Sequence, residues 1–254
     1  MMEQRNIYLV CDYIEKFKDF QSKELSSSQN EKNRFPKFQV SLTPLVLWNF
    51  FLVEYEIINK RKFVISFESK AFVFTVMYYF LQSSKFYNSP LFYTVPNCEI
   101  SLKKGLLIVG GVGVGKTSIM KTIVSLISKC SLNFDQHPVR MHNTVDIVEE
   151  FESCTNSSRI EVSKKYSKSF RVFDDVKNER EASNFGKVDL FKDILYKRCE
   201  NHNFRTVILC NYESEFNGDI YQAIEGFGRY GDRNYDRLFE AFNFIELKGI
   251  SNRK

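Results

Sequence analysis

The chain has few of the residues that mark a secreted or zinc-binding protein. Its 254 residues include three histidines and six cysteines, none of them in a C-x-x-C pair, and no histidine lies near a cysteine ligand set. A zinc site or a disulfide framework is therefore not indicated, and we expect reduced thiols in the cytoplasm. The cysteines are Cys11, Cys98, Cys130, Cys154, Cys199 and Cys210.

Long hydrophobic runs are also missing. The longest apolar stretches, Leu45 to Val53 and Ala71 to Leu81, are shorter than the roughly 18 residues that cross a bilayer. The first residues bring in acidic side chains early and offer no small-residue cleavage site, unlike a signal peptide. We therefore predict a cytoplasmic protein with no membrane partner.

The formal net charge of +5 is modest and there is no long basic tail, so charge neither demands nor excludes nucleic acid. Aromatic residues are plentiful, with 25 Phe and 13 Tyr, which predicts a core rich in phenylalanine. The polar stretch 26–36 is typical of a linker. We expect a small helical N-terminal region over residues 1–62 and one larger domain over residues 63–254.

The stretch KKGLLIVGGVGVGKTSIMKT carries the strongest signal. Four of its residues fit the phosphate-binding pattern G-x-x-x-x-G-K-S/T, namely Gly110, Gly115, Lys116 and Thr117. An apolar run, Leu106 to Val109, precedes the pattern, and a helix-compatible run to Ile127 follows it. The motif therefore has the strand, loop and helix that phosphate binding requires.

The chemistry of a triphosphate explains these residue types. Backbone N–H groups can surround the phosphates only where side chains do not intervene, and the following helix N-terminus favours an anion. Lys116 would reach the β and γ phosphates, and the Thr117 hydroxyl would bind Mg²⁺. A glycine-rich turn with an accidental lysine would give the same letters. The predicted cofactors are ATP and Mg²⁺, and the other loop residues predicted to bind the nucleotide are Gly110, Gly111, Val112, Gly113, Val114, Gly115 and Ser118.

Polar residues also follow two later apolar strands. Asp174 and Asp175 come after the predicted strand 169–173, and Asn211 comes after the predicted strand 205–210. Open α/β sheets bind ligands along the edge formed by the carboxyl ends of their strands. We predict that Asp174 is a Mg²⁺ ligand with Thr117 and that Asp175 is a general base for water. An exposed turn is the alternative for the two aspartates.

The remaining pattern alternates strands with helices. Spacing predicts helices near residues 7–25, 43–59, 68–82, 144–154, 188–199, 220–225 and 232–242, and strands at 63–65, 139–142 and 244–247. The first helix packs either on the protein's own core or on a partner. In the second helix, Leu45, Trp48, Leu52 and Tyr55 are predicted to face inward. This alternation predicts a three-layer α/β domain with a parallel sheet.

Five segments together resemble the AAA+ ATPases of the DnaC and IstB type, which are helicase loaders and transposition helper ATPases. The resemblance covers roughly Phe63 to Arg253 and implies a P-loop core of the ASCE class, with a parallel five-stranded sheet and no C-terminal lid domain. The segments are KGLLIVGGVGVGKTSIMK, VFDDVKNE, NFGKVDLFKDILYKR, ILCNY and RYGDRNYDRLFEAFNFIELKGISNR.

The resemblance also implies roles for single residues. Asn211 matches sensor 1, which positions water, and Arg253 matches the sensor 2 arginine, which contacts the nucleotide. Arg237 matches the arginine finger that completes a neighbouring subunit's site, with Arg233 as a competitor. A surface salt bridge to Asp232 or Asp236 is the alternative for both arginines.

Two residues depart from the family pattern. Lys177 stands where the family usually has glycine, and Asp175 stands where most AAA+ proteins have glutamate. Because the shorter carboxylate reaches less far, slow hydrolysis is expected.

We expect an ATPase in DNA replication or mobile-element biology, as DnaC-like helicase loaders are, with an IstB-like helper as the alternative. The resemblance implies a homo-oligomer that binds single-stranded DNA, and a replicative helicase or transposase bound through residues 1–62. Basic residues from Arg159 to Arg171, opposed in sequence only by Glu161, are either a solvated helix face or a DNA contact. A nucleotide-gated switch with little turnover and a small-molecule kinase are further alternatives.

Overall fold

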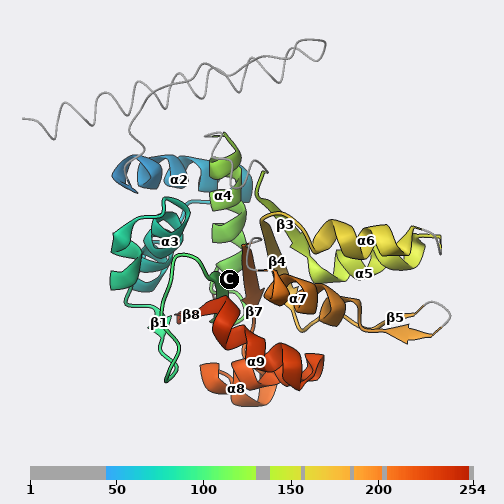
Figure 1. Cartoon of the computed structure of the whole chain (residues 1–254). Helices are drawn as coiled ribbons and strands as arrows, with labels where there is room; N and C mark the ends of the chain where they lie inside the picture. The colour runs from blue at the N-terminus through green and yellow to red at the C-terminus, as the bar shows by residue number, and fades with distance from the viewer. Residues whose placement is uncertain (1–43, 130–137, 156–157, 184–185, 202–204, 252–254) are drawn as a thin grey trace, which may run out of the picture. The chain divides into compact units, whose positions relative to one another are not determined.

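A computed structural model describes residues 44–129, 138–155, 158–183, 186–201 and 205–251 (Figure 1). The predicted helix at residues 7–25, Arg253, Cys11 and Cys130 lie outside these ranges. The chain divides into two compact units, and the second begins at Val64.

The described part of the first unit is one helix and the segment that follows it. Helix α2 runs from Pro44 to Asn59, as predicted. The rings of Trp48, Phe51 and Tyr55 pack against that of Phe63, with centroids 6.0, 5.0 and 4.9 Å apart. The predicted strand at residues 63–65 is wrong, because these residues form no strand and Phe63 instead packs on α2. Leu45, predicted to face inward, is 66% exposed.

The second unit is built on a six-stranded sheet. Its strands in spatial order are β1 (Phe92–Tyr93), β8 (Phe242–Leu247), β2 (Gly105–Gly110), β7 (Thr206–Cys210), β4 (Arg171–Val176) and β3 (Arg140–Asn143). The five strands from β8 to β3 are parallel, which confirms the predicted α/β P-loop core. The sixth strand, β1, pairs antiparallel with β8 and was not predicted. Two residues are too short to give an alternating pattern.

Helices precede or follow each parallel strand. They are α3 (Phe67–Phe80), α4 (Lys116–Lys129), α5 (Thr144–Ser153), α6 (Arg159–Tyr166), α7 (Leu190–Glu200), α8 (Ile220–Glu225) and α9 (Asp232–Ala241). Apart from α6, for which no bounds were predicted, these agree with the predicted helices to within a few residues. The short 3-10 segments η1 (Ser84–Asn88), η2 (Ser214–Phe216) and η3 (Gly226–Tyr230) and the hairpin of β5 (Ala182–Ser183) and β6 (Lys187–Val188) were not predicted.

The two faces of the sheet are covered by different helices. Alternate strand residues such as Leu107 and Phe173 belong to one hydrophobic cluster with residues of α5, α6, α7, α8 and α9. The neighbouring strand residues point to the opposite face, where α3 contacts β8 and α4, and α4 contacts β3 (Figure 1). Because both faces are buried, β2 and β7 are almost continuous runs of Val, Ile and Leu. The result is the predicted three-layer arrangement.

Strand order decides what meets at the carboxyl edge of the sheet. Strand β7 lies between β2 and β4, and Cys210 at its end is in register with both Val109 and Val176. The loop after β2, the end of β4 and the residue after β7 therefore share one edge. In the described part of the chain, no helix is both long enough and apolar enough to cross a bilayer.

Candidate nucleotide-binding site

The loop between β2 and α4 needs glycine for two different reasons. Gly113 and Gly115 have φ angles of 82° and 101°, a region that side-chain-bearing residues rarely adopt. At Gly110, a Cβ would lie 2.6 Å from the carbonyl oxygen of Leu247 on the adjacent strand. Val114 is buried and anchors the loop, whereas Val112 is 61% exposed. The backbone is therefore free of side chains where phosphates would approach.

Lys116 begins helix α4 and is buried beneath this loop. Its Nζ donates to the carbonyl oxygens of Gly110 at 2.7 Å and Gly111 at 2.9 Å, and to Oδ1 of Asn211 at 2.8 Å. The ammonium group thus lies at the helix N-terminus with neutral acceptors around it. A phosphate that took the place of these acceptors would gain a charge-assisted hydrogen bond.

Thr117 and Asp174 form a second pair. The Thr117 hydroxyl donates to Oδ1 of Asp174 at 3.1 Å, and Asp174 is only 7% exposed. Burial raises the pKa of Asp174, and the charge of Asp175 adds to this, while the Thr117 hydrogen bond lowers it. A buried carboxylate with a hydroxyl beside it is a donor set that suits a bound Mg²⁺.

The protein offers few ligands for such an ion. Among the residues that the structure describes, no group of three His, Cys, Asp or Glu side chains is placed to hold a metal. Mg²⁺ is usually held by one or two carboxylates together with phosphate oxygens and water. The residues present fit that pattern, with Thr117 and Asp174 as the protein ligands.

Asp175 lies in an irregular part of β4. The strand register shifts between Phe173 and Val176, and Asp175 has a φ of 62°. Its Oδ1 accepts from Nδ2 of Asn211 at 3.3 Å, and its carbonyl oxygen accepts from the Thr144 hydroxyl at 3.1 Å. Both aspartates therefore belong to the strand rather than following it, and the bulge turns the Asp175 side chain toward β7.

Asn211 joins the two halves of the site. Its amide oxygen accepts from Lys116, and its amide nitrogen donates to Asp175. The structure thus brings five of the predicted residues together at one sheet edge: Lys116, Thr117, Asp174, Asp175 and Asn211.

The predicted arginines do not join this cluster. Arg237 on α9 pairs with Glu200 of α7, with Nη1 2.9 Å from Oε1, and its guanidinium lies 4.9 Å from the ring centroid of Tyr196. The more exposed Arg233 lies over the same ring and 3.9 Å from the same carboxylate. The neighbouring Glu200 carboxylate raises the pKa of Arg237. The ion-pair partner is thus neither of the aspartates considered from sequence.

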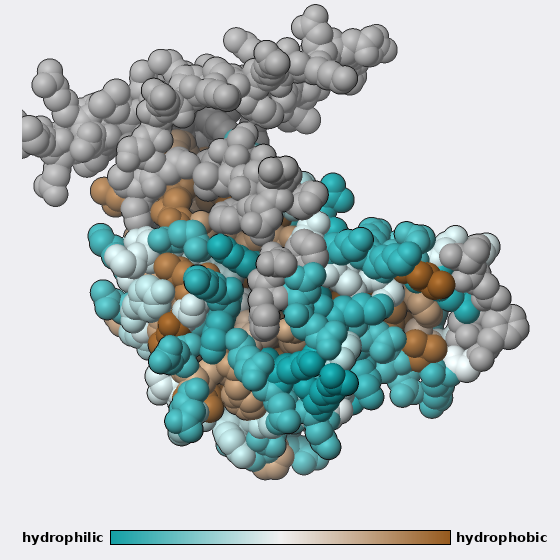
Figure 2. Space-filling model, viewed as in Figure 1, coloured by the Kyte–Doolittle hydropathy of each residue, from teal (hydrophilic) through white to brown (hydrophobic). Residues whose placement is uncertain are grey.

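Figure 2 shows a largely hydrophilic surface over α7 and α9. Arg233 is 70% exposed at its side chain and Arg237 is 24% exposed. Both arginines therefore belong to a surface that solvent or another chain can reach.

The basic stretch from Arg159 to Arg171 is more neutralised than its sequence indicates. Lys164 pairs with Glu161 at 3.1 Å, but Lys165 pairs with Glu150 of α5 at 2.8 Å. Within the stretch itself Glu161 is the one acidic residue, but folding brings α5 against α6 and adds Glu150. Arg171 itself is buried.

Sequence reasoning missed two contributors to the site. Thr144, read only as a helix start, donates to the backbone of Asp175, and Lys177, read as a departure from a family pattern, has a buried side chain. Thr144 follows a predicted strand, so the rule that identified Asp174 and Asn211 would also have found it. Nothing in the sequence indicates that Lys177 forms an ion pair with Glu213.

Comparison with known proteins gave similarity in structure only. No family model matches the chain, and no curated protein matches it. A crystal structure of the DnaC helicase loader is 16% identical, with 73% of this chain and 93% of that one covered and a TM-score of 0.48. A crystal structure of DnaI is 18% identical, with 74% and 89% covered and a TM-score of 0.46.

A third similar structure is domain III of the replication initiation protein DnaA from Thermotoga maritima. It is 17% identical, with 76% of this chain and 67% of that one covered and a TM-score of 0.46. The TM-scores compare the course of the backbone only. The chemistry of the site therefore has to be inferred from its own side chains.

Proposed function

We propose that this chain binds ATP with Mg²⁺ and hydrolyses it to ADP and phosphate, as an AAA+ ATPase of the DnaC and IstB type. One observation carries the proposal. A chain of hydrogen bonds runs from Lys116 through Asn211 to Asp175, beside the Thr117–Asp174 pair and directly under a glycine-rich loop. A cation, a metal-ligand pair and a further carboxylate set around one phosphate loop are the parts that phosphoryl transfer to water requires.

Each residue has a separate role in this proposal. The loop amides and the N-terminus of α4 hold the phosphates, and Lys116 moves its hydrogen bonds from the loop carbonyls to phosphate oxygens. Thr117 and Asp174 hold Mg²⁺, which supplies positive charge to the phosphates when it is bound. Asp175 accepts a proton from the attacking water, and Asn211 orients that water and the Asp175 carboxylate.

The proposal extends to an oligomer in which Arg237, or Arg233, reaches the ATP of a neighbouring subunit. Support comes from the resemblance of the segment Arg229 to Arg253 to the arginine-finger region and from the surface position of both arginines. Their contacts with Glu200 and Tyr196 hold both guanidinium groups on the α7 side of α9. If the arginine of one subunit completes the site of its neighbour, hydrolysis depends on assembly of the oligomer.

Finer roles follow from the resemblance alone. We propose that residues 1–62 bind a replicative helicase, or a transposase in an IstB-like system, and that the assembled protein holds single-stranded DNA. Arg253 is proposed as the sensor 2 residue. The pairing of Lys164 and Lys165 with carboxylates favours the solvated-face reading of residues 159–171 over a DNA contact.

A nucleotide-gated switch with little turnover is the second candidate. Asp175 has the shorter of the two acidic side chains, and its Oδ1 already accepts from both Asn178 and Asn211. An oxygen so engaged must release a hydrogen bond before it takes a proton from water itself, which slows hydrolysis by that route.

Measurement of ATP binding and phosphate release on the full chain tests the proposal. Asp175→Asn should keep the wild-type Kd for ATP and release phosphate about 10² to 10⁴ times more slowly. Asp193→Asn, at an exposed position of α7, is the matched control and should behave as wild type. Wild-type phosphate release from Asp175→Asn would contradict the assigned role. Tight ATP binding without turnover in the wild type would favour the switch, and no binding of ATP would reject both.

A further inference from the structure

Two residues with side chains hold left-handed backbone conformations just where the site is built. Asp175 has a φ of 62° and Lys177, two residues later, a φ of 79°. This region is unfavourable for a residue with a Cβ and persists only where the surroundings enforce it. Contacts with other segments of the chain must therefore stabilise the turn that orients Asp175.

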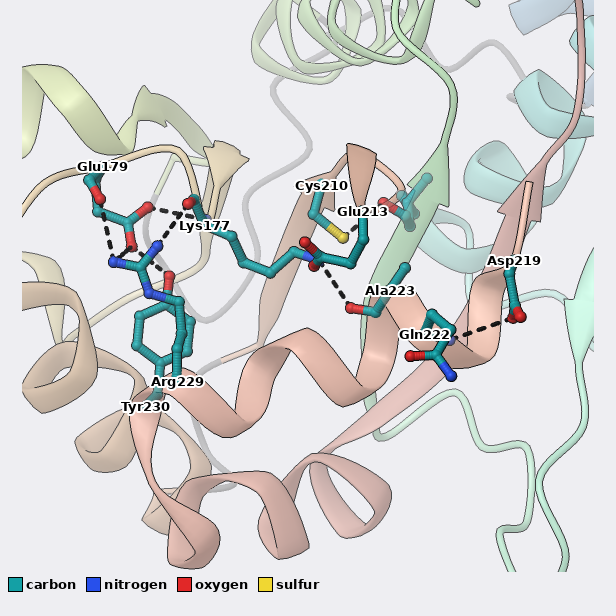
Figure 3. A network of polar contacts seen from close by, with 10 residues as sticks. Lys177, Glu179, Cys210, Glu213, Asp219, Gln222, Ala223, Arg229 and Tyr230 are labelled. Atoms are coloured by element: carbon teal, nitrogen blue, oxygen red, sulfur yellow. Dashed lines mark hydrogen bonds and ion pairs between the residues drawn. The ribbon is translucent and has the colours of Figure 1, made fainter. Parts of the chain in front are cut away.

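The side chain of Lys177 supplies one such contact (Figure 3). Its Nζ forms an ion pair with Oε1 of Glu213, donates to the carbonyl oxygen of Ala223 at 2.8 Å and lies 5.3 Å from the ring centroid of Phe227. The Lys177 side chain is 9% exposed and that of Glu213 is 39% exposed. An ion pair on such a buried lysine is screened less than a surface pair.

Glu213 and Lys177 lie at the same distance in sequence from two residues of the site. Glu213 follows Asn211 by two residues, and Lys177 follows Asp175 by two residues. The ion pair therefore joins the turn after β4 to the loop after β7. These are the two segments whose side chains meet where Asn211 donates to Asp175.

Gly226 makes room for the pair. A Cβ at this position would lie 2.1 Å from Oε1 of Glu213 and 3.1 Å from Nζ of Lys177. A side chain at the first residue of η3 would therefore displace the ends of Glu213 and Lys177, and glycine leaves the ion pair in place.

A second group of contacts ties the same turn to η3. Arg229 donates to the carbonyl oxygens of Lys177 at 2.6 Å and Glu179 at 3.2 Å, and the Tyr230 hydroxyl donates to the Glu179 carboxylate (Figure 3). That carboxylate, only 3% exposed, also accepts from the backbone N–H of Lys177 at 2.9 Å. Both the backbone and the side chain of Lys177 are thus fixed.

We propose that Lys177 and Glu213 are positioning residues of the hydrolysis site, whose ion pair holds the Asp175 turn and the Asn211 loop in register. This rests on the proposed ATPase function. A glycine at position 177 would adopt the same φ without strain, but it would leave Glu213 without its cation. Lys177 therefore has an unfavourable backbone conformation, but its side chain links the two loops. This link sets the distance between Asp175 and Asn211.

The first test is a double-mutant cycle on ATP turnover in the full chain. Lys177→Met and Glu213→Gln should each lower kcat about 10- to 100-fold with the Kd for ATP changed less than about 2-fold. The double variant should be no slower than the slower single variant, because both remove the same contact. Lys177→Gly should be as slow as Lys177→Met, since relief of strain does not replace the ion pair.

The matched control is Lys187→Met, which removes an exposed pair with Glu181 whose side chains are 83% and 49% exposed. It should turn over ATP as the wild type does. Wild-type kcat in Lys177→Met would overturn the proposal. So would a loss of kcat that multiplies in the double variant, because independent sites are additive in free energy.

Hydrogen exchange of the nucleotide-free protein tests the same link without any turnover. The amides of Lys177 and Asn178, which donate to Glu179 and to the Asp175 carbonyl, should exchange at least about 10-fold faster in Lys177→Met and unchanged in Lys187→Met. A wild type that hydrolyses no ATP rejects the proposed function, and exchange at these two amides still decides the link. Unchanged exchange in Lys177→Met, or faster exchange spread over the whole sheet, would overturn it.

Discussion

Lys116→Ala should lower the stability of the nucleotide-free protein and should also abolish its stabilisation by ATP. In the structure, Nζ of Lys116 satisfies the carbonyl oxygens of Gly110 and Gly111 and the amide oxygen of Asn211, all within 2.9 Å. A hydrogen bond from a charged donor is worth about 1.5 to 3 kcal/mol, and the three share one ammonium group. We therefore expect a loss of about 3 kcal/mol.

That loss translates into a melting shift. For a domain of this size, 1 kcal/mol corresponds to about 2 to 4 °C in Tm, so Lys116→Ala should melt about 6 to 12 °C below the wild type without nucleotide. At an ATP concentration of 100 times Kd, binding should stabilise the wild type by about 2.7 kcal/mol, or about 5 to 11 °C. The variant should show no such shift.

Differential scanning fluorimetry with and without Mg²⁺ and ATP measures both quantities. Lys121→Ala, at an exposed position of the same helix, is the control and should match the wild type in both. If Lys116→Ala melts with the wild type when free, the three hydrogen bonds do not stabilise the fold. If it also gains the full ATP shift, phosphate binding does not use this lysine, and the site has been assigned wrongly.

Two further predictions concern α9 and the edge of the sheet. Asp175→Asn and Arg237→Ala subunits, each inactive alone, should recover phosphate release when they are mixed. In a mixed oligomer, one intact carboxylate can meet one intact arginine across an interface. No recovery at any ratio would remove the main support for a shared site. Burial, together with Arg171 and Lys165, lowers the pKa of His142 to about 4 from an ordinary 6.5. The unfolded chain therefore binds more protons between these values, so stability should fall as pH drops from about 6.5 to 4. Urea unfolding at pH 7 and pH 5 should show a smaller fall for His142→Gln than for the wild type, and an equal fall would refute the assignment.

Local patterns were enough for much of the fold and for part of the site. The phosphate loop, the carboxylates after an apolar strand and Asn211 after another are each recognisable from neighbours in sequence, and the parallel sheet follows from alternation. Strand β1 could not be found this way, because its two residues pair antiparallel with β8, which lies far away in the sequence. Phe63 was misassigned for a related reason, since its partners are side chains on α2 rather than a strand.

The sequence by itself determined which residue types reach the carboxyl edge of the sheet, because periodicity and glycine placement are properties of adjacent residues. Only the tertiary structure decided which of them touch. Strand order placed β7 between β2 and β4, and this put Asn211 between Lys116 and Asp175. The fold also paired Lys177 after β4 with Glu213 after β7, a contact between residues 36 positions apart that no local pattern encodes.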